Sequence, residues 1–201
     1  MQQTPRTEPA LTPRHGAALV MLARQTLARH FQRPAEPAAG EPLATILADP
    51  SLQARCGTFV TLKIDGQLRG CIGSLSATVP VVTGVRDNAL NAAFRDPRFP
   101  PLDRRELDRV QIEVSVLSEP VPLAYRDADD LLRRLTPGID GVILRKGAAS
   151  ATFLPQVWEQ LPRPESFLSH LCLKAGLSAD EWRRGKLEVR IYRVQHFEES
   201  V

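Results

Sequence analysis

The segment "CGTFVTLKIDGQLRGCIGSL", residues 56–75, constrains the fold of this chain more than any other part of it. Two stretches of alternating apolar and polar residues flank an Asp-Gly pair, which is the strongest short-range signal for a β-hairpin. A hairpin of this kind lies with one face on a hydrophobic core. Its register therefore decides which side chains reach that core.

Two registers are compatible with the segment. A two-residue Asp-Gly turn places Cys71 opposite Val60, so that Arg69 and Cys71 share the apolar face. A three-residue loop with a bulge at Gly66 places Ile72 opposite Val60 and gathers the large aliphatic side chains on one face. We predict the second register, because burying an unpaired arginine among aliphatic side chains costs on the order of several kcal/mol.

In this register every large apolar side chain of the hairpin except Phe59 lies on one face. The polar face of the hairpin carries Thr61, Lys63, Arg69 and Cys71. Cys71 then lies about 7 Å along the strand from Arg69, whose charge favours the thiolate form that acts as a nucleophile. Gly70 and Gly73 indicate close approach of a ligand or of another backbone. The alternative is that Cys71 is a small core residue beside a glycine bulge.

The rest of the chain mixes helices and hairpins without strict strand–helix alternation. "RVQIEVSVLSEP", residues 109–120, alternates most regularly and predicts a half-buried strand. Further strands are expected in a second hairpin and at the end of the chain, and helices at 16–31, 77–96, 127–135 and 164–176. This pattern predicts an α+β fold with a mainly antiparallel sheet flanked by helices. We expect a disordered tail over residues 1–13 and a single domain over 14–201.

Composition excludes several classes of function. The net charge is +3, the arginines are scattered and aromatic residues make up only 5%, so nucleic-acid binding is not expected. No apolar run approaches the roughly 18–20 residues of a membrane span. Three irregularly spaced cysteines fit a reducing cytoplasm. C-x-x-C and H-E-x-x-H motifs are absent, so we predict no metal site from local ligands and name no cofactor.

Other polar residues have both structural and functional interpretations. Asp96 and Arg98 either form a local cap and ion pair or line a site for a polar ligand. Glu113, on the polar side of its strand, is either solvated or part of the same site. Lys174 either supplies charge to a site or favours the end of its helix. Three histidines have no evident partner at ligand spacing: His15, His30 and His196.

Five blocks, in order, carry a resemblance to a known family: "LRGCIGSL", "NAAFRDPRFPPL", "IEVSVLSEP", "FLPQVWEQLP" and "FLSHLCLKAGL". They resemble the AMMECR domain family, whose bacterial and archaeal members are called AmmeMemoRadiSam system protein A. The resemblance runs from about residue 14 to residue 198. It implies a larger and a smaller subdomain, with "LRGCIG" at the functional centre.

The resemblance also implies a set of site residues. The positions that match its blocks are Arg69, Gly70, Cys71, Ile72, Gly73, Asp96, Arg98, Phe99, Glu113, Gln156 and Lys174. The family name implies two partners, a Memo-type protein and a radical SAM protein, but no reaction. Asp140 departs from the family pattern, in which we expect a histidine or some residue other than aspartate. We therefore carry no role over to this position.

Two hypotheses follow. In the first, the protein is an enzyme in which Cys71 is the nucleophile and Arg69 favours its thiolate. Asp96, Arg98 or Glu113 would then orient a small polar substrate. In the second, it is a non-catalytic accessory protein that docks the Memo-type or radical SAM partner through the "LRGCIG" strand and the loop containing Arg98 and Phe99.

Overall fold

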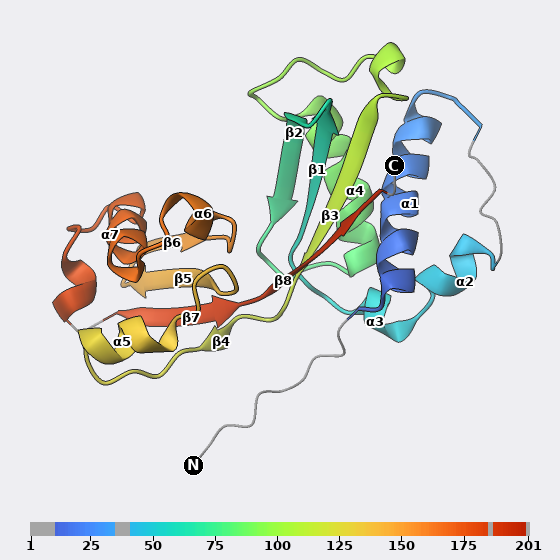
Figure 1. Ribbon diagram of the computed structural model, residues 1–201. Helices are drawn as coiled ribbons and strands as arrows, with labels where there is room; N and C mark the ends of the chain where they lie inside the picture. The colour runs from blue at the N-terminus through green and yellow to red at the C-terminus, as the bar shows by residue number, and fades with distance from the viewer. Residues whose placement is uncertain (1–10, 35–40, 185–186, 200–201) are drawn as a thin grey trace. The chain divides into compact units, whose positions relative to one another are not determined.

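The computed structural model describes residues 11–34, 41–184 and 187–199, and the chain forms two compact units. Unit 1 consists of residues 1–117 and 195–201, and unit 2 of residues 118–194. Each unit combines helices with a four-stranded antiparallel sheet (Figure 1). The expected α+β class, with a larger and a smaller subdomain, is confirmed.

Unit 1 contains a sheet with strand order β2-β1-β3-β8. Its elements are α1 (Pro13–His30), α2 (Leu43–Leu47), α3 (Pro50–Gln53), β1 (Thr58–Ile64), β2 (Gln67–Ser74), α4 (Val81–Phe94), the 3-10 helix η1 (Arg104–Glu106), β3 (Val110–Leu117) and β8 (Val194–Glu198). Helix α4 packs on β1 and β2, and α1 packs on α4 and β3 (Figure 1). The core lies between these helices and the sheet, where Val60, Leu62 and Val114 are fully buried.

Helix α1 begins earlier than predicted. Thr12 is its N-cap, its hydroxyl accepts a hydrogen bond from the His15 backbone N–H, and Pro13 occupies the first turn. The amide side chain of Gln195 bonds both the N–H and the C=O of Leu11. The prediction of a disordered tail is therefore wrong for residues 11–13, because a cap and a contact distant in sequence fix them. Residues 1–10 lie outside the described part of the chain.

The hairpin combines the two-residue Asp-Gly turn of the first register considered from sequence with the pairing of the second. Asp65 and Gly66 both have positive φ, 51° and 76°, as in a two-residue type I′ turn. The register then shifts between Leu62 and Lys63, which leaves Arg69 as an extra residue in β2. Beyond this bulge Ile72 pairs with Val60, as predicted. The three-residue loop with a bulge at Gly66 was wrong, because the bulge lies inside the strand.

Unit 2 contains a sheet with strand order β4-β7-β5-β6. Its elements are β4 (Val121–Pro122), α5 (Ala128–Arg134), β5 (Gly141–Lys146), β6 (Ala149–Phe153), α6 (Val157–Gln160), α7 (Pro164–Lys174), the 3-10 helix η2 (Glu181–Arg184) and β7 (Glu188–Tyr192). Trp158 stacks on Phe167 at 3.7 Å between ring centroids, in a core that also buries Trp182. Helix α7 ends just before Gly176, which has φ 76°.

The last strand predicted from sequence is two strands in two different sheets. β7 pairs with β5 and β4 in unit 2, whereas β8 lies beside β3 in unit 1 (Figure 1). Arg193 separates them. Val194 follows Ile191 by three residues, so one continuous strand would place the two side chains on opposite faces of one sheet. The break between the units accounts for the imperfect alternation of this segment.

Candidate functional site

A row of chemically active side chains crosses the sheet of unit 1 on the face opposite α1 and α4. Thr61 on β1 pairs directly with Cys71 on β2 and with Glu113 on β3. Residues directly opposite each other in antiparallel strands share a face, so a thiol, a hydroxyl and a carboxylate follow one another. We call the surface formed by Phe59, Thr61, Lys63, Cys71, Glu113 and Ser115 the polar face.

Cys71 is half-buried, and its sulfur has a hydrogen-bond donor. The Thr61 hydroxyl donates to Cys71 Sγ at 3.2 Å. A hydroxyl directed at sulfur stabilises negative charge that develops there. The hairpin register thus gives the thiol a neighbour that is suited to a nucleophile.

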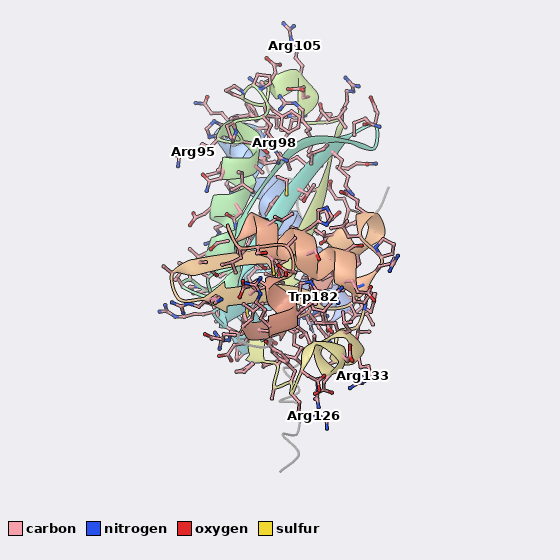
Figure 2. The ribbon with its side chains drawn as sticks, turned by 90° about the vertical axis from the view of Figure 1, so that its left-hand side faces the viewer. Arg95, Arg98, Arg105, Arg126, Arg133 and Trp182 are labelled. Carbon is pink, nitrogen blue, oxygen red and sulfur yellow. The ribbon has the colours of Figure 1, made fainter. Side chains whose placement is uncertain are left out.

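The backbone of Cys71 is held from the other side by the loop that follows α4. Asp96 Oδ2 accepts the Cys71 N–H at 2.8 Å, and Arg98 Nη2 donates to the Cys71 carbonyl at 3.2 Å. β2 is an edge strand, so these bonds satisfy groups that no neighbouring strand reaches. Figure 2 shows Arg98 beside Arg95 at the end of unit 1 where this loop lies.

Asp96 is the centre of this attachment. It is 4% exposed and also accepts the Arg98 guanidinium at 2.7 and 2.9 Å. The guanidinium of Arg98, followed by the backbone N–H groups of Cys71 and Arg98, holds the pKa of Asp96 well below its usual range. Asp96 and Arg98 therefore form the local ion pair that one of the two interpretations predicted. Arg98 nevertheless keeps 54% of its side chain exposed.

Arg69 is engaged elsewhere, contrary to its expected role beside Cys71. Its guanidinium forms a two-pronged pair with Glu106 at 2.8 and 2.9 Å and donates to the carbonyls of Pro100 and Pro101. The bulge at Arg69 breaks the alternation that would have set it on the polar face opposite Lys63. Arg69 therefore bonds β2 to the segment that precedes β3. None of these bonds involves the thiol of Cys71.

The two glycines of the motif make room for other parts of unit 1. A Cβ at Gly70 would lie 2.1 Å from the carbonyl oxygen of Ala92 in α4, and a Cβ at Gly73 would overlap the Phe59 ring. Close approach of backbone and side chain, which glycine permits, therefore explains both positions. Ile72 points to the core, where it packs against the buried cluster.

Glu113 lies at the end of the row formed with Cys71 and Thr61, and it contacts His196 on β8. Its carboxylate accepts Lys63 Nζ at 2.9 Å and lies 3.4 Å from His196 Nδ1, which is 3.0 Å from the Ser115 hydroxyl. Hydrogen bonding to His196, followed by that to Lys63, lowers the pKa of Glu113 to about 2 against the opposing effect of burial. Glu113 is therefore an ionised carboxylate on a half-buried surface.

This pKa predicts how stability depends on pH. The folded pKa of about 2 lies below the ordinary value of 4.5, so the carboxylate stabilises unit 1 above pH 4.5 and loses this effect as the pH falls toward 2. We expect Glu113→Gln to lower the free energy of unfolding by about 2 kcal/mol at pH 7, allowing for partial solvent screening. Urea unfolding followed by far-UV circular dichroism should show the difference from wild type shrinking below pH 4. A difference that is constant with pH would contradict it.

The remaining predicted residues divide between the units. Phe99 lies beside Arg98, with the guanidinium carbon 5.6 Å from the ring centroid. Gln156 and Lys174 belong to unit 2, where Lys174 Nζ donates to the Thr152 carbonyl and lies over the Phe153 ring. The structure thus brings together Cys71, Asp96, Arg98 and Phe99 in unit 1, with Glu113 two strands from Cys71 on the same sheet.

Asp140, the departure from the family pattern, has a structural role. Its buried carboxylate accepts the Thr136 N–H at 2.8 Å, and its carbonyl accepts the Trp158 indole N–H.

Sequence reasoning placed Thr61 on the polar face without giving it a role, and it missed Glu106 and His196 as members of this region. The contact between Thr61 and Cys71 could have been predicted from the register, because the two residues are direct partners on the polar face. Glu106 and His196 lie 37 and 83 residues from Arg69 and Glu113, so no local spacing could pair them. His15, His30 and His196 have no partner at ligand spacing in the sequence, but in the fold His15 lies 3.5 Å from Asp49, His30 stacks on Phe94 and His196 lies 3.4 Å from Glu113.

Metal ligation and membrane insertion can be examined over residues 11–34, 41–184 and 187–199. Within these ranges no three or more His, Cys, Asp or Glu side chains are grouped so that they could hold a metal ion. None of the helices described there has both the length and the apolar character needed to cross a bilayer.

Comparison with known proteins identifies the family of this chain and agrees with its fold. The model of the AMMECR1 family matches residues 20–197. A protein of Thermofilum pendens is 40% identical over 94% of this chain and 92% of its own length, and Protein MK0488 of Methanopyrus kandleri is 38% identical over 94% and 91%. The crystal structure of Uncharacterized Protein PH0010 from Pyrococcus horikoshii is similar with a TM-score of 0.75, at 33% identity and 94% coverage of both chains. The family match spans both units, and on this evidence the chain belongs to the AMMECR1 family.

Proposed function

We propose that this protein is a cysteine-dependent enzyme that acts on a small polar molecule at the polar face of unit 1. It would work in the cytoplasm as an AmmeMemoRadiSam system protein A, alongside a Memo-type protein and a radical SAM protein. One observation carries the proposal: the Thr61 hydroxyl donates to Cys71 Sγ in the same cross-strand row as the ionised Glu113. A nucleophile and a charged anchor for the substrate thus share one surface.

The proposed roles follow from the contacts of each residue. Cys71 gives up its thiol proton to solvent, the thiolate adds to an electrophilic carbon of the substrate, and the electron pair of that carbon's π bond moves onto its heteroatom. Thr61 stabilises the negative charge on sulfur before the bond forms. Glu113, held ionised by His196 and Lys63, binds a hydrogen-bond donor of the substrate. Asp96 and Arg98 are positioning residues, because they hold the backbone of Cys71.

The rate of Cys71 alkylation tests this activation. We expect Thr61→Val, which preserves the shape of the side chain but removes the donor, to slow alkylation by iodoacetamide about five-fold at pH 7, the effect of one hydrogen bond. Mass spectrometry assigns the label to Cys71 separately from Cys56 and Cys172. Thr61→Ser retains the hydroxyl and should react at nearly the wild-type rate. Equal rates for the valine variant and wild type would contradict the proposed activation.

A second candidate function, partner docking, is favoured by the loop next to the motif. Arg98 lies over Phe99 on an exposed loop, and Leu68 on the same hairpin is 42% exposed. Arginine and aromatic side chains are enriched among residues that dominate binding energy at interfaces. This function requires purified protein to associate with the Memo-type or the radical SAM partner. Analytical ultracentrifugation that detects no complex across micromolar concentrations would remove it.

A further inference from the structure

Phe59 lies on the polar face, and the proposed reaction gives it no role. Its neighbours along β1, Thr58 and Val60, are buried, whereas Phe59 is only half-buried. It belongs to neither of the hydrophobic clusters that the described residues form. A half-buried aromatic side chain outside both clusters, on the same sheet face as a thiol and a carboxylate, offers a ring surface to a ligand.

The ring of Phe59 lies over Gly73, two residues from Cys71 on β2. Phe59 pairs with Gly73 on β2, and a Cβ at Gly73 would lie 2.2 Å from two of its ring atoms. The ring therefore occupies the space above Gly73 that any other residue would fill. Gly73 is two residues from Cys71 on the same strand, so about 7 Å separates the positions from which their side chains rise.

Polar residues take the neighbouring positions of the sheet on the same face. Ser115 pairs with Phe59 on β3, and Thr61 follows Phe59 on the same face of β1. The ionised Glu113 pairs with Thr61 one row further along. The same rows of the sheet face thus carry one aromatic ring, a thiol, two hydroxyls and a carboxylate, the mixture that binds small amphipathic molecules.

We infer that the substrate of Cys71 carries a planar unsaturated ring that packs against Phe59, with a hydrogen-bond donor directed toward Glu113. This inference rests on the proposed function and adds to it the chemical class of the substrate. Aromatic rings recognise other planar rings by offset or edge-to-face contact, which saturated groups cannot reproduce. Gly73 is then a specificity-determining position, because a larger residue there displaces the ring.

Matched chloroacetamides test the inference on the full chain. In each reaction a sulfur–carbon bond forms, the carbon–chlorine bond breaks, chloride leaves, and the thiol proton passes to solvent. We compare the rate constants of Cys71 with N-benzyl- and N-cyclohexylmethyl-2-chloroacetamide, each divided by its rate constant with glutathione. The corrected benzyl-to-cyclohexylmethyl ratio should be about five in the wild type, the factor of one aromatic contact.

The variants separate the ring from the thiol. Phe59→Leu and Gly73→Ala should both bring the ratio close to one, whereas Phe59→Tyr should preserve it. Circular dichroism identifies any variant that fails to fold. A ratio of one in the wild type, or an undiminished ratio in folded Phe59→Leu, overturns the inference.

A non-covalent measurement distinguishes failure of the inference from failure of the proposed function. If Cys71 reacts with neither reagent, the nucleophile is lost, but the ring site is judged separately in Cys71→Ser. Saturation-transfer difference NMR should then show benzamide binding more strongly than cyclohexanecarboxamide, with the preference removed by Phe59→Leu in the same background. Equal signals for the two amides in Cys71→Ser overturn the inference.

Discussion

Gly70→Ala is expected to lower the free energy of unfolding of unit 1 by about 3 kcal/mol, the upper range for an inserted methyl group in a packed interior. The new Cβ would lie 2.1 Å from the backbone carbonyl oxygen of Ala92, inside helix α4. A flexible side chain could move aside, but this oxygen can move only with the helix. Either α4 shifts away from β2, or the strand bends at the motif.

The measurement has to report on unit 1. All four tryptophan and tyrosine residues belong to unit 2, so intrinsic fluorescence follows the wrong part of the chain: Tyr125, Trp158, Trp182 and Tyr192. Hydrogen exchange of the β1 amides, measured at increasing urea concentrations, reports on the stability of unit 1. Gly66→Ala is the matched control, because Gly66 has φ 76° with open space around it, and we expect a cost of about 1 kcal/mol. A Gly70→Ala variant no less stable than this control would refute the packing argument.

Asp96→Asn is expected to cost about 3 kcal/mol, because a buried carboxylate that accepts several hydrogen bonds loses its charge and one acceptor. The amide retains the shape of Asp96, but its nitrogen cannot accept the Cys71 N–H or the Arg98 guanidinium. One of these donors is left without its acceptor at the edge of the sheet. The loop that follows α4 then separates more readily from β2.

An exposed acid in the same unit provides the control. Asp108 pairs with Arg33, but 71% of its side chain is exposed, so Asp108→Asn should cost less than about 1 kcal/mol. Exchange of the Cys71 amide should accelerate strongly in Asp96→Asn and remain unchanged in Asp108→Asn. Wild-type protection of that amide in the Asp96 variant would show that the carboxylate does not hold β2.

The turn and the bulge show what a local pattern can predict about this hairpin. Alternation correctly paired Ile72 with Val60, because only that register buries the aliphatic side chains. The Asp-Gly pair favoured a two-residue turn, which conflicted with that register. An extra residue at Arg69 allows both the two-residue turn and the pairing of Ile72 with Val60. Neither the turn residues nor the alternation alone predicts where this extra residue lies. The register at the motif was therefore predictable, but the environment of Arg69 was not.

The candidate site divides in a similar way. Cys71 and Glu113 were placed on polar faces by alternation within their own strands, and the order of the strands then brought both to one sheet. The partners of Arg69 and Glu113 come from distant segments, so charge spacing along the chain contained no sign of Glu106 or His196. Gly70 and Gly73 were recognised as places of close approach, but α4 and Phe59 could be identified only in the fold.

The position of β8 also bears on the order in which the ribosome delivers this chain. In the chain, residues 118–193 of unit 2 precede the strand that finishes the sheet of unit 1. Until then β3 is an open edge, and Arg24 of α1 lacks the Glu199 carboxylate that it later binds. The sheet that carries Cys71 therefore stays one strand short until the chain has passed through nearly all of unit 2. The thiol surface reaches its final form only after the last strand is added.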